Sequence, residues 1–126
     1  MRVFVTRGFG RIQRREGIED KSLCKVVVDA EHGMIDADLG GGLIKMRLAR
    51  KGEGKSGGFR LLLGFMIGSR TVFLYAYAKS NLANVPDDEV REWRQRGALF
   101  LSLSDDELDE FVAEDELREV HCDNED

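Results

Sequence analysis

The stretch that decides the fold reads FRLLLGFMI at residues 59–67, GS at residues 68–69 and RTVFLYAYAK at residues 70–79. A glycine-containing pair between two segments rich in large apolar residues is typical of a two-residue hairpin turn. The segment LIKMRL before them, at residues 43–48, alternates apolar and cationic residues with a period of two, which indicates a strand with one core face. Because each connection is too short for a parallel crossover, we expect an antiparallel meander.

Helical periodicity lies on both sides of these strands. A brief strand at residues 3–5 is expected to precede two helices, one basic and bounded by Gly8 and Gly17, the other running from about Asp20 to Gly33. Two more helices are predicted after Pro86 and after Ser104, which forms a capping box with Glu107. The apolar positions that carry the four helices are Phe9 and Ile12; Leu23, Val26, Val27 and Ala30; Val90, Trp93, Gly97 and Leu101; and Leu108, Phe111 and Val112. The predicted fold is α+β, in the order β-α-α-β-β-β-α-α, with a small antiparallel sheet backed by helices.

The composition indicates one globular domain over residues 1–126, since 42% of the residues are apolar and 34% are charged. The longest apolar runs are much shorter than the ~20 residues that span a bilayer. Charge is divided unevenly, with +7 on residues 1–80 and −12 on residues 81–126, giving the net charge of −5. This division suggests a basic body for a polyanion and an acidic tail from about residue 119, which we expect to be frayed and dispensable.

The cysteines and histidines form no recognisable site. Cys24 and Cys122 lie far apart without a CxxC motif, so they need not form a disulfide; a packed thiol is expected at Cys24, and a reducing cytoplasm as the compartment. With only His32 and His121 besides, we expect no metal and no cofactor. Residues 49–56 fit a relaxed phosphate-loop pattern, but a strand follows instead of the required helix, which argues against nucleotide hydrolysis.

The strands bring cations and aromatic rings together. Lys45 and Arg47 share one face of their strand, and Arg60 opens the next. On the following strand a period of two predicts that Phe73, Tyr75, Tyr77 and Lys79 line one face, leaving Val72, Leu74, Ala76 and Ala78 for the other. Cations that neutralise phosphates beside rings that stack on unpaired bases are the requirements of an RNA site. The pattern alone leaves open the alternative that the rings belong to the core and the cations are merely solvated.

Three segments carry a family resemblance: DADLGGGLIKMRLAR at residues 36–50, GKSGGFR at residues 54–60 and FLYAYAK at residues 73–79. They resemble the RelE/ParE superfamily of toxins, and more narrowly the HigB-like branch of RelE toxins, over residues 1 to about 112. The resemblance implies a RelE-like toxin of a bacterial type II toxin–antitoxin module. It further implies a ribosome-dependent mRNA endoribonuclease, an mRNA interferase that inhibits translation, neutralised by a cognate antitoxin with a helix-turn-helix DNA-binding domain.

The cations and rings supply the candidate site residues. The catalytic candidates are Lys45, Arg47, Arg60, Lys79, Tyr75 and Tyr77, and the RNA-binding candidates are Arg50, Lys51, Lys55 and Ser56. Guanidinium groups suit permanent phosphate clamps, whereas a lysine whose pKa is lowered by neighbouring cations could transfer a proton. We expect the cations to be exposed, so that replacing Arg60 would leave stability nearly unchanged.

Two other functions stay open at this stage. One is a non-catalytic ParE-like inhibitor that acts by protein binding, and the other is an inactive RNA-binding relic. Convergence of the cations on one another would separate an RNA-cleaving site from a protein-binding surface, because only the former needs several positive charges around one phosphate.

Overall fold

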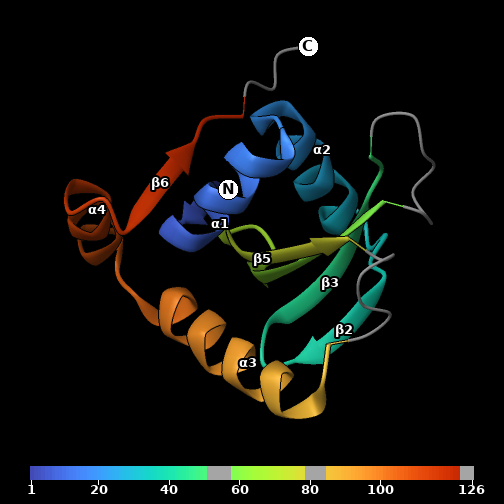
Figure 1. The fold of residues 1–126 in the computed structure, drawn as a ribbon. Helices are drawn as coiled ribbons and strands as arrows, with labels where there is room; N and C mark the ends of the chain where they lie inside the picture. The colour runs from blue at the N-terminus through green and yellow to red at the C-terminus, as the bar shows by residue number, and fades with distance from the viewer. Residues whose placement is uncertain (51–57, 79–84, 123–126) are drawn as a thin grey trace.

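The computed structural model of the protein describes residues 1–50, 58–78 and 85–122. These residues form a six-stranded sheet with helices on both faces (Figure 1). In chain order the elements are β1 (Arg2–Thr6), α1 (Arg7–Glu16), α2 (Asp20–Glu31), β2 (Ala37–Gly40), β3 (Leu43–Leu48), β4 (Phe59–Met66), β5 (Arg70–Ala78), α3 (Asp87–Ser102), α4 (Asp105–Ala113) and β6 (Leu117–Val120). Among the described residues, no helix is both long and apolar enough to cross a membrane.

The strands are arranged in the order β2-β3-β4-β5-β1-β6. The predicted α+β class is confirmed, and so is the antiparallel meander of β3, β4 and β5. Gly68 takes a φ of 74° in the turn between β4 and β5, a backbone conformation that favours glycine. Two short edge strands, β2 and β6, were not predicted. Strand β1 pairs in parallel with β5, which the long connection between these two strands allows.

Two apolar cores cover the two faces of this sheet. Leu61 and Leu63 of β4 face α1 and α2, whereas Leu62 between them faces the side of α3 and α4. The alternation along β4 therefore serves both cores, which is why this strand reads as an almost continuous apolar run. All three leucine side chains are fully buried.

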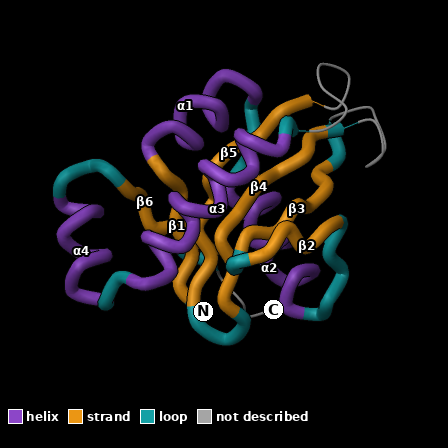
Figure 2. Tube along the Cα trace, turned by 90° about the horizontal axis from the view of Figure 1, so that it is seen from below, coloured by secondary structure: helices purple, strands orange, loops and turns teal. Residues whose placement is uncertain are grey.

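A close contact between two glycines fixes the position of α3 on the sheet. A Cβ atom added at Gly64 of β4 would lie 3.5 Å from the Cα and the carbonyl oxygen of Gly97 in α3. The absence of side chains at both positions lets the helix backbone approach the strand closely. Figure 2 shows α3 crossing the sheet, with α4 beside β6. The predicted stripe of Val90, Trp93 and Gly97 accordingly faces the sheet.

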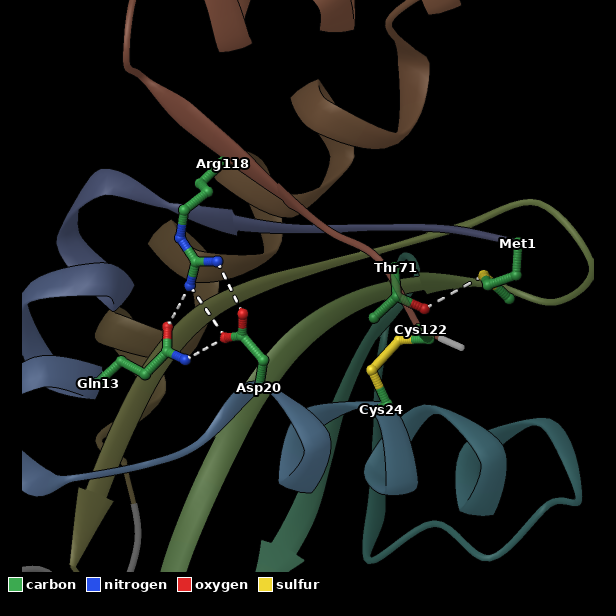
Figure 3. Close-up of a disulfide and its surroundings, with 7 residues drawn as sticks. All are labelled: Met1, Gln13, Asp20, Cys24, Thr71, Arg118 and Cys122. Carbon is green, nitrogen blue, oxygen red and sulfur yellow. Dashed lines mark hydrogen bonds and ion pairs between the residues drawn. A yellow bond between two sulfur atoms is a disulfide. The ribbon is translucent and has the colours of Figure 1, made fainter. Parts of the chain in front are cut away.

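Residues 117–122 belong to the fold, so the expectation of a free, frayed segment from about residue 119 is wrong for residues 119–122, while residues 123–126 lie outside the described residues. Strand β6 pairs antiparallel with β1, with Val120 opposite Val3. Cys122, just beyond β6, forms a disulfide with Cys24 of α2 (Figure 3). The prediction of a packed free thiol at Cys24 is therefore also wrong. Both cysteines lie beside the core under α1 and α2, where packing brings together two positions 98 residues apart.

Arginines hold the acidic C-terminal elements in place. Arg2 of β1 contacts Asp105 and Asp109 of α4 and Glu119 of β6, at N–O distances of 3.2, 2.7 and 2.9 Å. Arg118 of β6 binds the carboxylate of Asp20, as Figure 3 shows. The stripe of Leu108, Phe111 and Val112 also predicts that the last helix packs behind the sheet, away from Lys45 and Arg60, and this prediction is wrong. The helix lies on the same face as α3, with Leu108 in that core, at the β1–β6 edge.

The disulfide should contribute measurably to stability. Reduction, or the Cys24→Ser/Cys122→Ser double substitution, is expected to lower the free energy of unfolding by about 2–4 kcal/mol, because the bond closes a long loop in the unfolded chain. Urea unfolding with and without reductant measures this. Reductant should have no effect on the double variant. The expectation would be contradicted if reductant left the stability of the wild-type chain unchanged although mass spectrometry had verified its disulfide.

Low pH should weaken the ion pairs that hold β6 in place, because two carboxylates in them become protonated. Hydrogen bonds from Arg118 lower the pKa of Asp20, and those from Arg2 lower the pKa of Glu119. A carboxyl group with a lower pKa in the folded state stabilises the fold above its unfolded pKa, and this contribution is lost as the pH falls through the folded pKa. Urea unfolding from neutral pH into the acid range should therefore show a steeper loss for the wild-type chain than for the Asp20→Asn/Glu119→Gln variant. Equal slopes would contradict this reasoning.

Candidate functional site

Three of the predicted cations converge on one carboxylate. Lys45 and Arg47 project from the same face of β3, and Arg60 of β4 is the register partner of Arg47. Asp36, the residue before β2, accepts a hydrogen bond from the Nε of Arg47 at 2.9 Å. Its other carboxylate oxygen lies 3.8 Å from the Nζ of Lys45 and 3.7 Å from the Nε of Arg60. The cations therefore form one group around Asp36 and are not spread over a solvated surface.

Burial differs strongly within this group. The side chain of Arg60 is 5% exposed and that of Asp36 13%, whereas Arg47 is 47% exposed. The expectation that Arg60 is an exposed cation is wrong, because it lies in the middle of the sheet between β3 and β5. Arg47 is thus the member of the group that offers most of its surface to a ligand.

The tyrosines join the cations on this face, but Phe73 does not. A β-bulge shifts the pairing of β4 with β5, so that Leu62 faces Tyr75 while Leu63 faces Phe73. Leu74 is the extra residue, and the alternation of β5 reverses there. Phe73 packs on Phe9 of α1, with ring centroids 5.4 Å apart, in the core on the other face. The predicted continuous row from Phe73 to Tyr77 is therefore wrong, since period-two counting fails across a bulge.

Tyr77 lies beside the cations and carries an unusual hydroxyl group. It is the register partner of Arg60, which places Arg47, Arg60 and Tyr77 in one row across three strands. The residue is only 7% exposed, and its hydroxyl has no hydrogen-bond partner within the part of the chain that the structure describes. Burial raises the pKa of the phenol, while the charge of Arg60 opposes this shift. A buried neutral hydroxyl in need of a partner is suited to donate to an anion.

The ring of Tyr75 packs against α3. Its ring stacks on that of Trp93, with centroids 5.0 Å apart and planes 16° from parallel, and the Arg96 guanidinium lies 4.8 Å from the Trp93 centroid. Tyr75 and Tyr77 have ring centroids 6.0 Å apart. Trp93 of α3 therefore already covers one face of the Tyr75 ring, which was predicted to stack on a base.

A groove of about 500 Å³ opens between the sheet and the start of α3, beside Lys45 and Tyr77. Leu62 lines it, and so do Val85 and Val90 on the side of α3. Two carboxylates, of Asp38 and Asp87, also line it, while Arg94 donates hydrogen bonds to the carbonyl oxygen of Leu39 at 2.6 and 3.0 Å. The groove thus has apolar walls and lies next to the cationic group.

The remaining predicted residues fall into two groups. Arg50, two residues after β3, has its guanidinium 5.1 Å from the centroid of the Phe59 ring. Lys51, Lys55, Ser56 and Lys79 lie outside the described residues. Sequence reasoning missed Asp36 and Trp93, although Asp36 begins the first of the three segments that carry the family resemblance and Trp93 belongs to the predicted apolar stripe.

Chemically, the group is suited to bind a phosphate. Guanidinium groups keep their charge and form paired hydrogen bonds to two oxygens of one phosphate. The exposed Arg47, supported by Lys45 and Arg60, can place positive charge around one anion.

The chain also matches a known protein family. The family model described as the RelE toxin of the RelE/RelB toxin–antitoxin system matches residues 1–120. The match runs from the N-terminus to the end of β6 and includes the whole site. Comparisons with curated proteins and with solved structures give no match.

Two substitutions in the site should affect stability differently. Tyr77→Phe removes a buried hydroxyl that has no partner in the described residues, so the free energy of unfolding should stay unchanged or rise by about 1 kcal/mol. Arg60→Ala leaves a void and removes one of the three cationic partners of Asp36, so it should cost about 1–3 kcal/mol. Chemical denaturation checks both, and a neutral Arg60→Ala variant would show that the buried guanidinium contributes nothing to folding.

Proposed function

The chain belongs to the RelE toxin family, and from that premise we propose that it is a ribosome-dependent endoribonuclease, which cuts mRNA during translation. Members of this family are toxins of toxin–antitoxin systems. The observation that carries the proposal is the convergence of Lys45, Arg47 and Arg60 on one face of the sheet, next to the hydroxyl of Tyr77. A surface that only binds a protein has no need for three cations around one point.

The proposed reaction is attack by the 2′-oxygen of a ribose on the neighbouring phosphorus. The new bond joins the 2′-oxygen to phosphorus and the bond to the 5′-oxygen breaks, so that a base takes one proton and an acid returns one to the leaving oxygen. Arg47 and Arg60 are proposed to stabilise the charge on the pentavalent phosphate, with Tyr77 as a hydrogen-bond donor. Lys45, Lys55 and Lys79 are the proposed proton-transfer groups, without assignment of base and acid.

The ribosome would supply what this site lacks. Proton transfer contributes about 10²–10⁴-fold to a rate, so the rest has to come from positioning and from charge stabilisation. Of the three cations around Asp36, only Arg47 is close to half exposed, which offers free RNA a small binding surface. Arg50, Lys51, Lys55 and Ser56 are proposed as further RNA contacts, and Tyr75 as a contact for a base.

The partner and the compartment are part of the same proposal. We propose a cognate antitoxin with a helix-turn-helix DNA-binding domain, and the cytoplasm as the place of action, because translated mRNA is found there. Cytoplasmic thiols are usually kept reduced, whereas the structure joins Cys24 to Cys122. The redox state of this pair in intact cells, measured by trapping free thiols with a maleimide, decides whether that bond exists where the toxin acts.

Expression without an antitoxin should arrest growth through translation and leave mRNAs cut within coding regions. Mapping RNA 5′ ends after induction measures this. Arg47→Ala should abolish cleavage while the protein stays folded, because Arg47 is 47% exposed and a surface ion pair contributes little to stability.

Arg91→Ala provides the matched control, since it removes an exposed arginine of α3 outside the site. It should cut mRNA as the wild-type chain does. Intact transcripts together with an inhibited protein target such as gyrase would favour the protein-binding inhibitor, and unimpaired growth would favour the inactive relic.

A further inference from the structure

The arrangement of the cations poses an electrostatic problem that the fold has to solve. Arg47 and Arg60 are direct partners across β3 and β4, and Lys45 lies one row away on the same face. Like charges placed opposite each other on neighbouring strands repel. The problem is sharpest for Arg60, whose side chain is 5% exposed, because a buried charge without a partner costs several kcal/mol.

Asp36 supplies the opposing charge from a fixed position. Its carboxylate lies within 4 Å of nitrogen atoms of all three cations and is itself only 13% exposed. Its backbone N–H donates to the carbonyl oxygen of Lys45 at 3.0 Å, continuing the pairing of β2 with β3. Strand β3, which carries Lys45 and Arg47, therefore also fixes the backbone position of Asp36.

We propose that Asp36 is the positioning residue of the cleavage site, a role that rests on the proposed function. The carboxylate accepts the Nε–H of Arg47 at 2.9 Å and so fixes the plane of the guanidinium. The terminal N–H groups of Arg47 have no partner among the residues that the structure describes. Because the guanidinium is planar, its other edge is left to receive two oxygens of an RNA phosphate.

The charges of the group fit this role. Three formal positive charges and one negative charge leave an excess of two, so Asp36 reduces the repulsion among the cations without cancelling their attraction for a phosphate. Asp36 acts through the cations and is not proposed to touch the RNA. It therefore differs from an inhibitory group that occupies the phosphate position, whose removal would speed the reaction.

The test compares Asp36→Asn with Asp20→Asn in single-turnover cleavage of mRNA on programmed ribosomes. Each substitution removes a carboxylate bound to an arginine, but Asp20 pairs with Arg118, away from the site. Asp36→Asn should lower the rate at saturation about 100-fold, as expected when a clamp is misplaced by about 1 Å. Its half-saturating concentration should stay the same or fall, because the loss of a negative charge strengthens the attraction for RNA. Asp20→Asn should change both values less than twofold.

Asp36→Glu keeps the charge but moves the carboxylate by one methylene group, so it should fold normally and lose about 10-fold in rate. This variant keeps the proposal testable if Asp36→Asn does not fold. Nuclear magnetic resonance of the arginine Nε–H groups gives a readout independent of activity: the Arg47 signal should be protected from exchange in the wild-type chain and lose protection in Asp36→Asn.

The outcomes separate the two proposals. An unchanged rate in Asp36→Asn, in a wild-type protein that does cleave, would overturn the positioning role and leave the endoribonuclease intact. A faster rate would identify Asp36 as an inhibitory occupant and also overturn it. A wild-type chain that cuts no mRNA on ribosomes would refute the proposed function, and the positioning role in cleavage with it.

Discussion

The carboxylate of Asp36 is the contact on which the site depends, because it allows three cations to share one face of a sheet. It places a negative charge between Arg47 and Arg60, which stand opposite each other on β3 and β4. Its position follows from backbone pairing, since the N–H of Asp36 binds the carbonyl oxygen of Lys45. The pairing of the short edge strand β2 with β3 thus fixes the position of the counterion for the whole group of cations.

Local patterns predicted most of the fold, and non-local pairing accounts for what they missed. Alternation and helical spacing are properties of neighbouring residues, so the meander and the four helices could be read directly. Strand β6 has only four residues, in an acidic segment, and exists because β1 offers it an edge. The same limit applies to the disulfide, because no local pattern links Cys24 to Cys122. Packing of α2 against the core brings the two together.

The site was predictable where one strand determines a side chain's direction. A period of two correctly places Lys45 and Arg47 on one face of β3, and the structure adds Arg60 to it through register. It fails at Phe73, where a bulge reverses the direction of the side chains. It also cannot find Asp36, which precedes its strand and has the opposite charge. A search for the counterion that a buried arginine requires would have pointed toward a nearby acid, but only once Arg60 was known to be buried.

The acidic residues that follow residue 80 in the sequence are not all close to the cationic group in the folded structure. Part of the acidic excess lies in α4 and β6, where Arg2 binds Asp109 and Glu119. Arg118 of β6 binds Asp20 of α2. In the strand order, β6 is three positions from β4, a distance of about 14 Å at the usual strand spacing. This exceeds the Debye length of ~8 Å at physiological salt, so the acid of β6, Glu119, hardly opposes an RNA at Arg60. Removing the residues after 118 would take away half of β6 and the disulfide, and would therefore test the stability of the sheet instead of the screening of the site.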